Sequence, residues 1–246
     1  MLTQHTARIA ASRATRMPTL VDEKADANYS YQGVVIDRDI QSTGGLTAEK
    51  MTSYELGYLM ESAQRDVSLD LRLFRDRLRN LITHLKLPAA DFDGSVEDQR
   101  NEGSIDFTGA EVQLDWRPAP STRFVLSYAS MHADASGLSP DSNHDEVEHE
   151  SSVPAFTWSV LAMHRFGRGW EGSLSYHRLA KIDWLGHGDE LPSYGRLDVR
   201  LARAFRLDGC QGEIALVVQN VGNDFVYFDA ENVFDRRSFI SISLRH

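Results

Sequence analysis

The densest run of possible metal ligands lies in residues 143–150, which read N-H-D-E-V-E-H-E. Histidine nitrogens and carboxylate oxygens are groups that bind transition metals. The same residues also suit a solvated acidic loop that keeps an outer surface hydrophilic, and we favour that interpretation. Three other histidines, His164, His177 and His187, are scattered along the chain, and we assign them to loops or to a polar interior. The sequence therefore predicts no metal site and no cofactor.

A second candidate site is a group of charges on one predicted strand. Arg196, Asp198 and Arg200 alternate with apolar neighbours, so their side chains share one strand face. They could line a substrate path, but charges that face an enclosed interior more often hydrogen-bond neighbouring strands or a domain held inside. Loop aromatics could stack on a ligand or belong to the aromatic belts of a membrane interface; these are Tyr29, Tyr31, Trp184, Phe225, Tyr227 and Phe228. Both explanations stay open, so no ligand-binding residue is assigned.

No pattern in the sequence predicts catalysis. The chain contains neither a G-x-S-x-G nucleophile turn nor an H-E-x-x-H metal motif. A glycine-rich phosphate loop between a strand and a helix is also missing, because Gly167-Arg168-Gly169 reads as a simple turn. We therefore predict that the chain is not an enzyme.

The elements that hold these side chains are about ten β-like segments in which apolar and polar residues alternate. In residues 67–73, for example, valine and leucine alternate with Ser68, Asp70 and Arg72. A strand points successive side chains to opposite faces, so each segment has one apolar and one polar face. The expected strands cover residues 3–16, 48–61, 66–77, 104–116, 122–131, 154–166, 170–182, 194–205, 212–221 and 238–246.

These strands are joined alternately by short and long connections. Short turns at residues 62–65, 117–121, 167–169 and 208–209 follow every second strand. We expect long loops at residues 18–45, 91–102, 184–192 and 222–237, and an acidic loop of about twenty residues between residues 131 and 154. Residues 78–87 fit either a loop or a continued strand. The C-terminus then lies on the short-turn side, which faces the periplasm in bacterial outer-membrane barrels.

The pattern favours an all-β, antiparallel transmembrane barrel over a soluble β-sandwich. The strands are about ten to thirteen residues long, close to the length that crosses a bilayer at a tilt. Charged residues in mid-strand suit a wet lumen. Aromatic residues lie near the ends of the apolar faces, as membrane interfaces require: Tyr54, Trp116, Tyr128, Trp158, Trp170 and Tyr176.

The composition of the 246 residues agrees with this interpretation. An apolar content of 41% fits strands that are polar on one side. The longest apolar stretch has about five residues, whereas a membrane helix needs roughly twenty. A net charge of −10 gives no basic surface for nucleic acid. The single cysteine, Cys210, excludes an internal disulfide. We therefore expect outer-membrane lipid, and no nucleic acid, among the partners.

Several stretches resemble the TonB-dependent outer-membrane receptors. Arg16-Met17-Pro18-Thr19-Leu20 is similar to the family's R-x-P-x-L stretch. Glu49-Lys50 followed by Tyr54-Glu55-Leu56-Gly57 is similar to its E-K-x-x-x-Y-E-L-G strand. Further similar stretches follow in the family's order over essentially the whole chain: Gly109-Ala110-Glu111, residues 192–200, residues 217–221 and residues 236–239 with the closing strand.

The resemblance implies that residues 1–246 are the C-terminal segment of a barrel with about 22 strands and a plugged lumen. It implies uptake of a scarce, siderophore-like ligand: an iron chelate, haem, cobalamin or an oligosaccharide. Energy would come from the TonB complex through N-terminal parts that this sequence lacks.

The first residues also lack the basic and apolar regions of a signal peptide. We therefore expect the beginning of the receptor to be missing, and the isolated chain not to transport. His246 occupies the last position, which is usually aromatic in the family, so we expect less efficient assembly.

Two other hypotheses remain open on the sequence alone. The chain could be a self-contained ten-stranded barrel with adhesive or enzymatic loops. It could also be a soluble, β-rich carbohydrate-binding module, because a sandwich alternates hydrophobic and polar residues in the same way.

Overall fold

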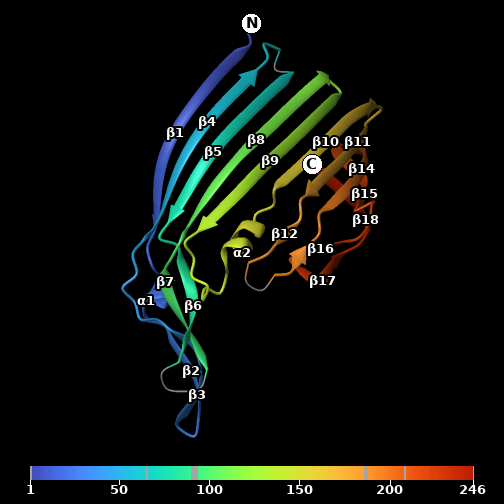
Figure 1. Cartoon of the computed structure of the whole chain (residues 1–246). Helices are drawn as coiled ribbons and strands as arrows, with labels where there is room; N and C mark the ends of the chain where they lie inside the picture. The colour runs from blue at the N-terminus through green and yellow to red at the C-terminus, as the bar shows by residue number, and fades with distance from the viewer. Residues whose placement is uncertain (1, 65, 90–93, 186–187, 208, 246) are drawn as a thin grey trace.

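A computed structural model of the chain describes residues 2–64, 66–89, 94–185, 188–207 and 209–245. Its main element is a ten-stranded sheet, in which every strand pairs antiparallel with its neighbours (Figure 1). In sheet order the strands are β1 (Gln4–Arg16), β4 (Glu49–Glu61), β5 (Val67–Arg79), β8 (Ser104–Ala119), β9 (Thr122–Ser136), β10 (Phe156–Gly167), β11 (Trp170–Leu179), β14 (Tyr194–Leu207), β15 (Cys210–Gln219) and β18 (Arg237–Arg245).

The alternation of apolar and polar residues predicted about ten long antiparallel strands, and the structure confirms them. The largest differences are at strand ends. For example, β9 continues five residues beyond the predicted end, to Ser136, and β11 stops at Leu179. The predicted turn at residues 117–121 is shorter, because β8 extends through Pro118 to Ala119 across a bulge that follows Trp116. A bulge tolerates a proline that has no N–H to donate.

The sheet is open, with β1 and β18 at its two edges. Every residue of β1 and of β18 is exposed. Within the described residues the sheet therefore does not close on itself, which argues against the hypothesis of a self-contained ten-stranded barrel. The edge strands present unpaired N–H and C=O groups to whatever lies beside them.

The two faces of this sheet differ as the sequence predicts. Residues in cross-strand register share a face, and one register row joins Ala7, Tyr58, Leu71, Val112, Tyr128 and Trp158. Large side chains on this apolar face are exposed, among them Ile9, Leu56, Leu73, Leu174 and Ile242. The opposite, polar face carries mid-strand charges such as Asp70, Arg72 and Glu111.

The compact hydrophobic core lies at one end of the polar face. Ile105, Ala133 and Ala135 are buried there, and Leu138 and Val153 pack against them from the connection between β9 and β10. That connection contains the short helix α2 (Glu146–Ser151), which begins at an Asp145 capping box. The fold therefore covers one end of the polar face with a segment that turns back over the strands.

The long connections hold a second sheet that the sequence analysis missed. The segments α1 (Leu20–Lys24), β2 (Asp26–Tyr31), β3 (Val34–Gln41), β6 (Ile82–Pro88) and β7 (Ser95–Asn101) lie in residues predicted as loops or left ambiguous. The four strands form a sheet in the order β2-β3-β7-β6 that projects beyond the ends of β4 and β5 (Figure 1). We call it the apical sheet. The predicted loops at 18–45 and 91–102 are thus wrong for β2, β3 and β7; residues 91–93 lie outside the described part.

Side-chain hydrogen bonds explain why alternation did not reveal the apical sheet. Asp98 is buried and accepts hydrogen bonds from the backbone N–H and the hydroxyl of Thr43, both at 2.9 Å. Gln99 is equally buried and accepts a hydrogen bond of 2.5 Å from Ser42. Polar residues in the centre of β7 thus bind a segment more than fifty positions away. Such pairing leaves no hydrophobic period in the sequence.

Two smaller ribbons complete the fold at the same end. β12 (Ile182–Asp183) pairs with β13 (Glu190–Leu191), and β16 (Phe225–Tyr227) pairs with β17 (Asp229–Phe234). In the described part of the chain, neither helix is long and apolar enough to cross a membrane. The long connections lie at one end of the large sheet and the short turns at the other (Figure 1).

Candidate functional site

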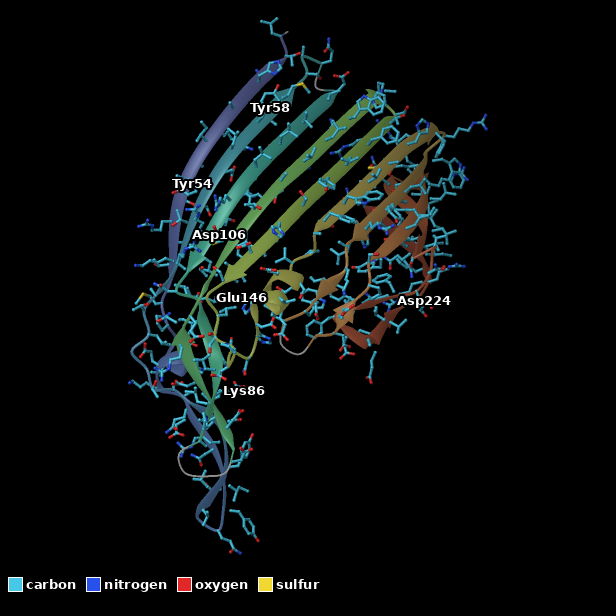
Figure 2. The ribbon with its side chains drawn as sticks, viewed as in Figure 1. Tyr54, Tyr58, Lys86, Asp106, Glu146 and Asp224 are labelled. Carbon is cyan, nitrogen blue, oxygen red and sulfur yellow. The ribbon has the colours of Figure 1, made fainter. Side chains whose placement is uncertain are left out.

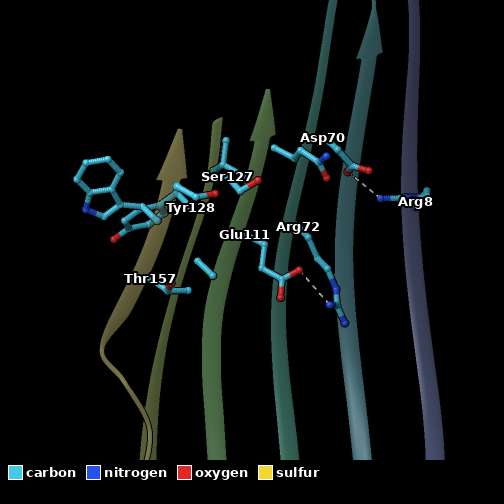
Figure 3. A pocket seen from close by; sticks show the side chains of 12 residues that line it. Arg8, Asp70, Arg72, Glu111, Ser127, Tyr128 and Thr157 are labelled. Atoms are coloured by element: carbon cyan, nitrogen blue, oxygen red, sulfur yellow. Dashed lines mark hydrogen bonds and ion pairs between the residues drawn. The ribbon is translucent and has the colours of Figure 1, made fainter. Parts of the chain in front are cut away.

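The polar face of the large sheet holds a pocket of about 340 Å³. Strands β1, β5, β8, β9 and β10 supply the charged and hydroxyl side chains that line it (Figure 3). Among them are Arg8, Asp70, Arg72, Glu111, Ser127 and Thr157. We call this surface the polar wall.

Cross-strand ion pairs organise the polar wall. The guanidinium of Arg8 lies 2.9 Å from Asp70, and that of Arg72 lies 3.1 Å from Glu111 (Figure 3). Arg72 also lies 2.8 Å from Glu55 of β4. These side chains are between about a quarter and a half exposed, so each pair contributes less than about 1 kcal/mol to stability. The pairs keep the wall hydrophilic while leaving little net charge on it.

The charges predicted on one strand face lie at the other side of the same sheet. Arg196 donates two hydrogen bonds to Asp198, at 2.8 and 2.7 Å. Arg200 forms ion pairs with Glu171 and Glu213 on the neighbouring strands. The structure therefore places the predicted group on the polar face, where it bonds within its own strand and across to its neighbours.

The histidine-rich segment 143–150 leads into α2 and makes up all of this helix except Ser151. Asp145 accepts a hydrogen bond from the backbone N–H of Glu148 at 2.8 Å and caps the helix. His144 pairs with Glu148 at 3.2 Å, and the Nδ1 of His149 lies 2.8 Å from the carbonyl oxygen of Asp145. Across the described residues, no three His, Cys, Asp or Glu side chains are grouped as metal ligands.

A second pocket, of about 540 Å³, lies where α2 meets the apical sheet. His84 and Glu97, from β6 and β7, line it together with Asn143, His144 and His149. Sequence reasoning missed His84 and Glu97 because the two residues lie in segments without a recognised strand pattern. His84 and Glu97 come together only when β6 pairs with β7, which places His84 opposite Gln99, two residues from Glu97.

Glu97 is the polar centre of this second pocket. It accepts hydrogen bonds from Nδ1 of His84 at 3.0 Å and from Asn143 at 2.6 Å. Burial opposes ionisation of the carboxyl group, but these hydrogen bonds and the charges of His84 and Lys86 outweigh it. Together they hold the pKa of Glu97 below its ordinary value. The carboxylate therefore joins the apical sheet to the connection that precedes α2.

Four of the loop aromatics pack against one another. The rings of Tyr194 and Phe225 stack at 4.4 Å, and Phe225 stacks on Phe234 at 5.2 Å. Trp184 meets Tyr227 at 5.9 Å and Phe228 at 5.7 Å. Tyr227 also meets Phe234 at 6.5 Å, which joins Trp184, Phe225, Tyr227 and Phe228 into one cluster beside the two small ribbons. Tyr29 and Tyr31 lie apart from it, exposed on β2.

The scattered histidines lie in different surroundings. His177 lies on the polar face, where its ring meets Tyr194 at 5.9 Å. The sequence predicts a loop or a polar interior for His164, but it lies on the apolar face, in register with Thr122 and Gly172. Its Nδ1 lies 2.8 Å from the hydroxyl of Thr122, which satisfies the ring there. The predictions for His187 and His246 concern residues outside the described part of the chain.

Two residues singled out by the sequence patterns bind each other. Glu49 is buried at the start of β4, and its carboxylate accepts hydrogen bonds from Arg16 at 2.5 and 2.9 Å. The same carboxylate accepts a hydrogen bond from the backbone N–H of Ile82 at 2.8 Å. The pair joins the ends of β1 and β4 to the first residue of the apical strand β6. Arg16 and Glu49, which the sequence patterns singled out, therefore have a structural role: they hold β1, β4 and β6 together.

Comparison with solved structures shows the same fold in three receptors. The ferric-catecholate import receptor Fiu from E. coli K12 has a TM-score of 0.67 at 13% identity, over 97% of this chain and 32% of that one. The ferric enterobactin receptor PfeA from Pseudomonas aeruginosa, a G324V mutant, has a TM-score of 0.66 at 17% identity, over 98% and 38%. The siderophore receptor PiuA from Acinetobacter baumannii has a TM-score of 0.67 at 13% identity, over 97% and 34%.

This chain thus spans about a third of the length of the receptors it matches. No curated protein sequence matches it. A family model described as "TonB dependent receptor-like, beta-barrel" matches residues 2–221, which is most of the chain. Members of this family are transport receptors of the Gram-negative outer membrane and not enzymes. The chain belongs to the TonB-dependent receptor-like β-barrel family.

Proposed function

We propose that residues 1–246 form the C-terminal part of the barrel wall of a TonB-dependent receptor that takes up a scarce ligand across the outer membrane. The observation that carries this proposal is the ten-stranded antiparallel sheet with one exposed apolar face and one charged face. An apolar outer face meets lipid, and a polar inner face lines a lumen. The polar wall would then face the lumen and the plug of the whole receptor.

An iron chelate is the ligand class that we favour. The similar structures are described as ferric-catecholate, ferric enterobactin and siderophore receptors. Haem, cobalamin and oligosaccharides remain the alternatives, and another similar structure is described as a copper transporter. The apical sheet and the pocket around Glu97 lie at the end where an external ligand would arrive.

The proposal includes an orientation in the membrane. The short turns and the C-terminus lie in the periplasm, and the apical sheet lies outside the cell, as in other barrels of this type. Contact with the TonB complex would involve parts of the receptor beyond these residues. The 246 residues alone would therefore not import a ligand, and import by this chain alone would contradict that part of the proposal.

A labelling experiment tests the orientation. Cys210 begins β15 next to a short turn and is the only cysteine of the chain, so it reports on the turn side. A C210S variant with S30C reports on the apical hairpin instead, because Ser30 is an exposed residue of β2. In intact cells, a membrane-impermeant maleimide should label Ser30→Cys but reach Cys210 only after permeabilisation. The reverse pattern would refute the proposed orientation.

A further inference from the structure

On the apolar face of the sheet, basic residues replace apolar residues toward one end of β5. Along β5 the apolar face is built by Val67, Leu69, Leu71 and Leu73, and the same face then continues with Arg75, Arg77 and Arg79. The spacing of two residues is unbroken, so all seven side chains project from one side of the strand. The side chain of each of these arginines is between 42% and 49% exposed.

On the neighbouring strands β1 and β4, the same face also changes from apolar to basic residues at the level of Arg75. Arg79 of β5 is in register with Lys50 of β4. Arg77 is in register with Thr52 of β4, which pairs in turn with Arg13 of β1. Tyr54 of β4 is in register with Arg75, so an aromatic ring marks the boundary. Five cations on three adjacent strands thus form a patch that we call the basic band: Arg13, Lys50, Arg75, Arg77 and Arg79.

The band is only partly neutralised by the protein itself. Asp106 of β8 lies 2.9 Å from Arg75, 3.5 Å from Arg77 and 2.8 Å from Arg79. One carboxylate cannot accept from all the N–H groups of three guanidiniums, because each carries five donors. The Arg77 contact is the longest of the three: it is made by the buried Nε, which forms no hydrogen bond at that distance. Asp134, in register with Asp106, is a second carboxylate on this part of the face.

The position of the band identifies the kind of ligand it fits. It lies directly beyond the apolar surface, in the part of β4 and β5 nearer the apical sheet; Tyr54 lies at its border with the apolar surface, and Asp106 lies farther toward the apical sheet (Figure 2). Arginine on the lipid face is costly in the bilayer centre but not at the interface. Guanidinium groups bind phosphate through paired hydrogen bonds. The surplus of cations is local, because the whole chain carries a net charge of −10.

We propose that the basic band binds the phosphate groups of an anionic glycolipid in the outer leaflet of the membrane. This inference rests on the proposed function, because the apical end must face outwards for the band to reach that leaflet. The chain would then be held at a fixed depth by its apolar face and by phosphate contacts on one flank.

Binding of the full chain to vesicles tests the inference. The vesicles contain phosphatidylcholine alone, or phosphatidylcholine with diphosphoryl lipid A, and bound protein is measured by flotation. The wild-type chain should bind the phosphorylated vesicles more tightly. The triple variant R75Q/R77Q/R79Q should lose that preference, with about fivefold weaker binding for each arginine removed.

Two further variants separate lipid binding from folding. The matched control R168Q/R206Q/R245Q removes as many arginines from the short-turn end, and it should keep the preference for lipid A. D106N removes the carboxylate that occupies the three arginines, and it should bind phosphorylated vesicles more tightly than wild type. A misfolded variant would not gain affinity.

The outcomes distinguish this inference from the function on which it rests. Equal binding of wild type to both kinds of vesicle would overturn the glycolipid site and leave the membrane barrel intact. Equal losses in the triple variant and its control would overturn the site as well. If the wild type binds neither kind of vesicle, the result contradicts the proposed function itself, that the chain is part of a membrane-embedded barrel.

Discussion

At the scale of single residues, the buried carboxylate of Glu49 holds three strands together. It joins β1, β4 and β6 through Arg16 and the backbone of Ile82. Sequence patterns drew attention to Arg16 and Glu49 separately, but they could not show that the two residues meet. Residues more than thirty positions apart become neighbours only through strand pairing.

Replacing Glu49 with alanine should therefore destabilise the fold. The change leaves the N–H of Ile82 without its acceptor and Arg16 with only the more distant Asp22, at 3.7 Å, which costs about 1–3 kcal/mol of unfolding free energy. Denaturant titration in detergent measures this loss. Asp70→Ala is the matched control, because Asp70 pairs with the half-exposed Arg8 and should cost less than about 1 kcal/mol. Equal losses in the two variants would contradict the account.

Glu97 gives the apical sheet a pH dependence. Its pKa is lowered in the folded chain, so its contribution to stability is complete above the ordinary carboxylate pKa of 4.5 and is lost as the pH falls below that value. Hydrogen exchange of β7, corrected for intrinsic rates, should therefore speed up on acidification through this range. Glu97→Gln should weaken the protection at neutral pH and flatten its pH dependence. An unchanged pH profile in this variant would show that Glu97 is not the responsible group.

At the scale of elements, the alternation of apolar and polar residues was enough to predict the large sheet. Three of the four short turns contain glycine or proline, and the fourth, at residues 62–65, is a short polar break in the alternation, so the pairing order of neighbouring strands followed. The apical sheet was not predictable, because Asp98 and Gln99 stabilise it through hydrogen bonds to Thr43 and Ser42. The aromatic cluster was half predictable: its residues were recognised, but their mutual packing was not.

Gly109 shows how closely two strands can be packed. It begins the Gly109-Ala110-Glu111 pattern of β8, and a Cβ atom there would lie 2.4 Å from the ring of Phe74 and 2.5 Å from the carbonyl oxygen of Ser130. Gly109→Ala should therefore destabilise the sheet by about 1–3 kcal/mol, through overpacking. Gly222→Ala is the control, because a Cβ atom there would meet open space and its φ lies outside the left-handed region. Denaturant midpoints of the two variants compare them; equal midpoints would remove the steric explanation.

At the scale of the whole molecule, the open sheet explains why site residues stay unassigned. A lumen is formed by all strands of a barrel together, and this chain spans about a third of the receptors it matches. The polar wall and the pocket around Glu97 are therefore one side of a larger enclosure in our proposal. The sequence could predict which residues face inwards, because strand period determines that. It could not predict what those residues face across the lumen.

The distribution of tryptophans allows the most direct test of the central claim, that one face of this sheet meets lipid. The chain has four tryptophans. Trp116, Trp158 and Trp170 belong to the apolar face, whereas Trp184 lies in the aromatic cluster beside the small ribbons. Variants that keep one tryptophan and replace the others with phenylalanine can be reconstituted in bilayers with brominated acyl chains. The account predicts strong quenching of the three tryptophans on the apolar face and weak quenching of Trp184. Equal quenching at all four positions, or stronger quenching of Trp184, would contradict it.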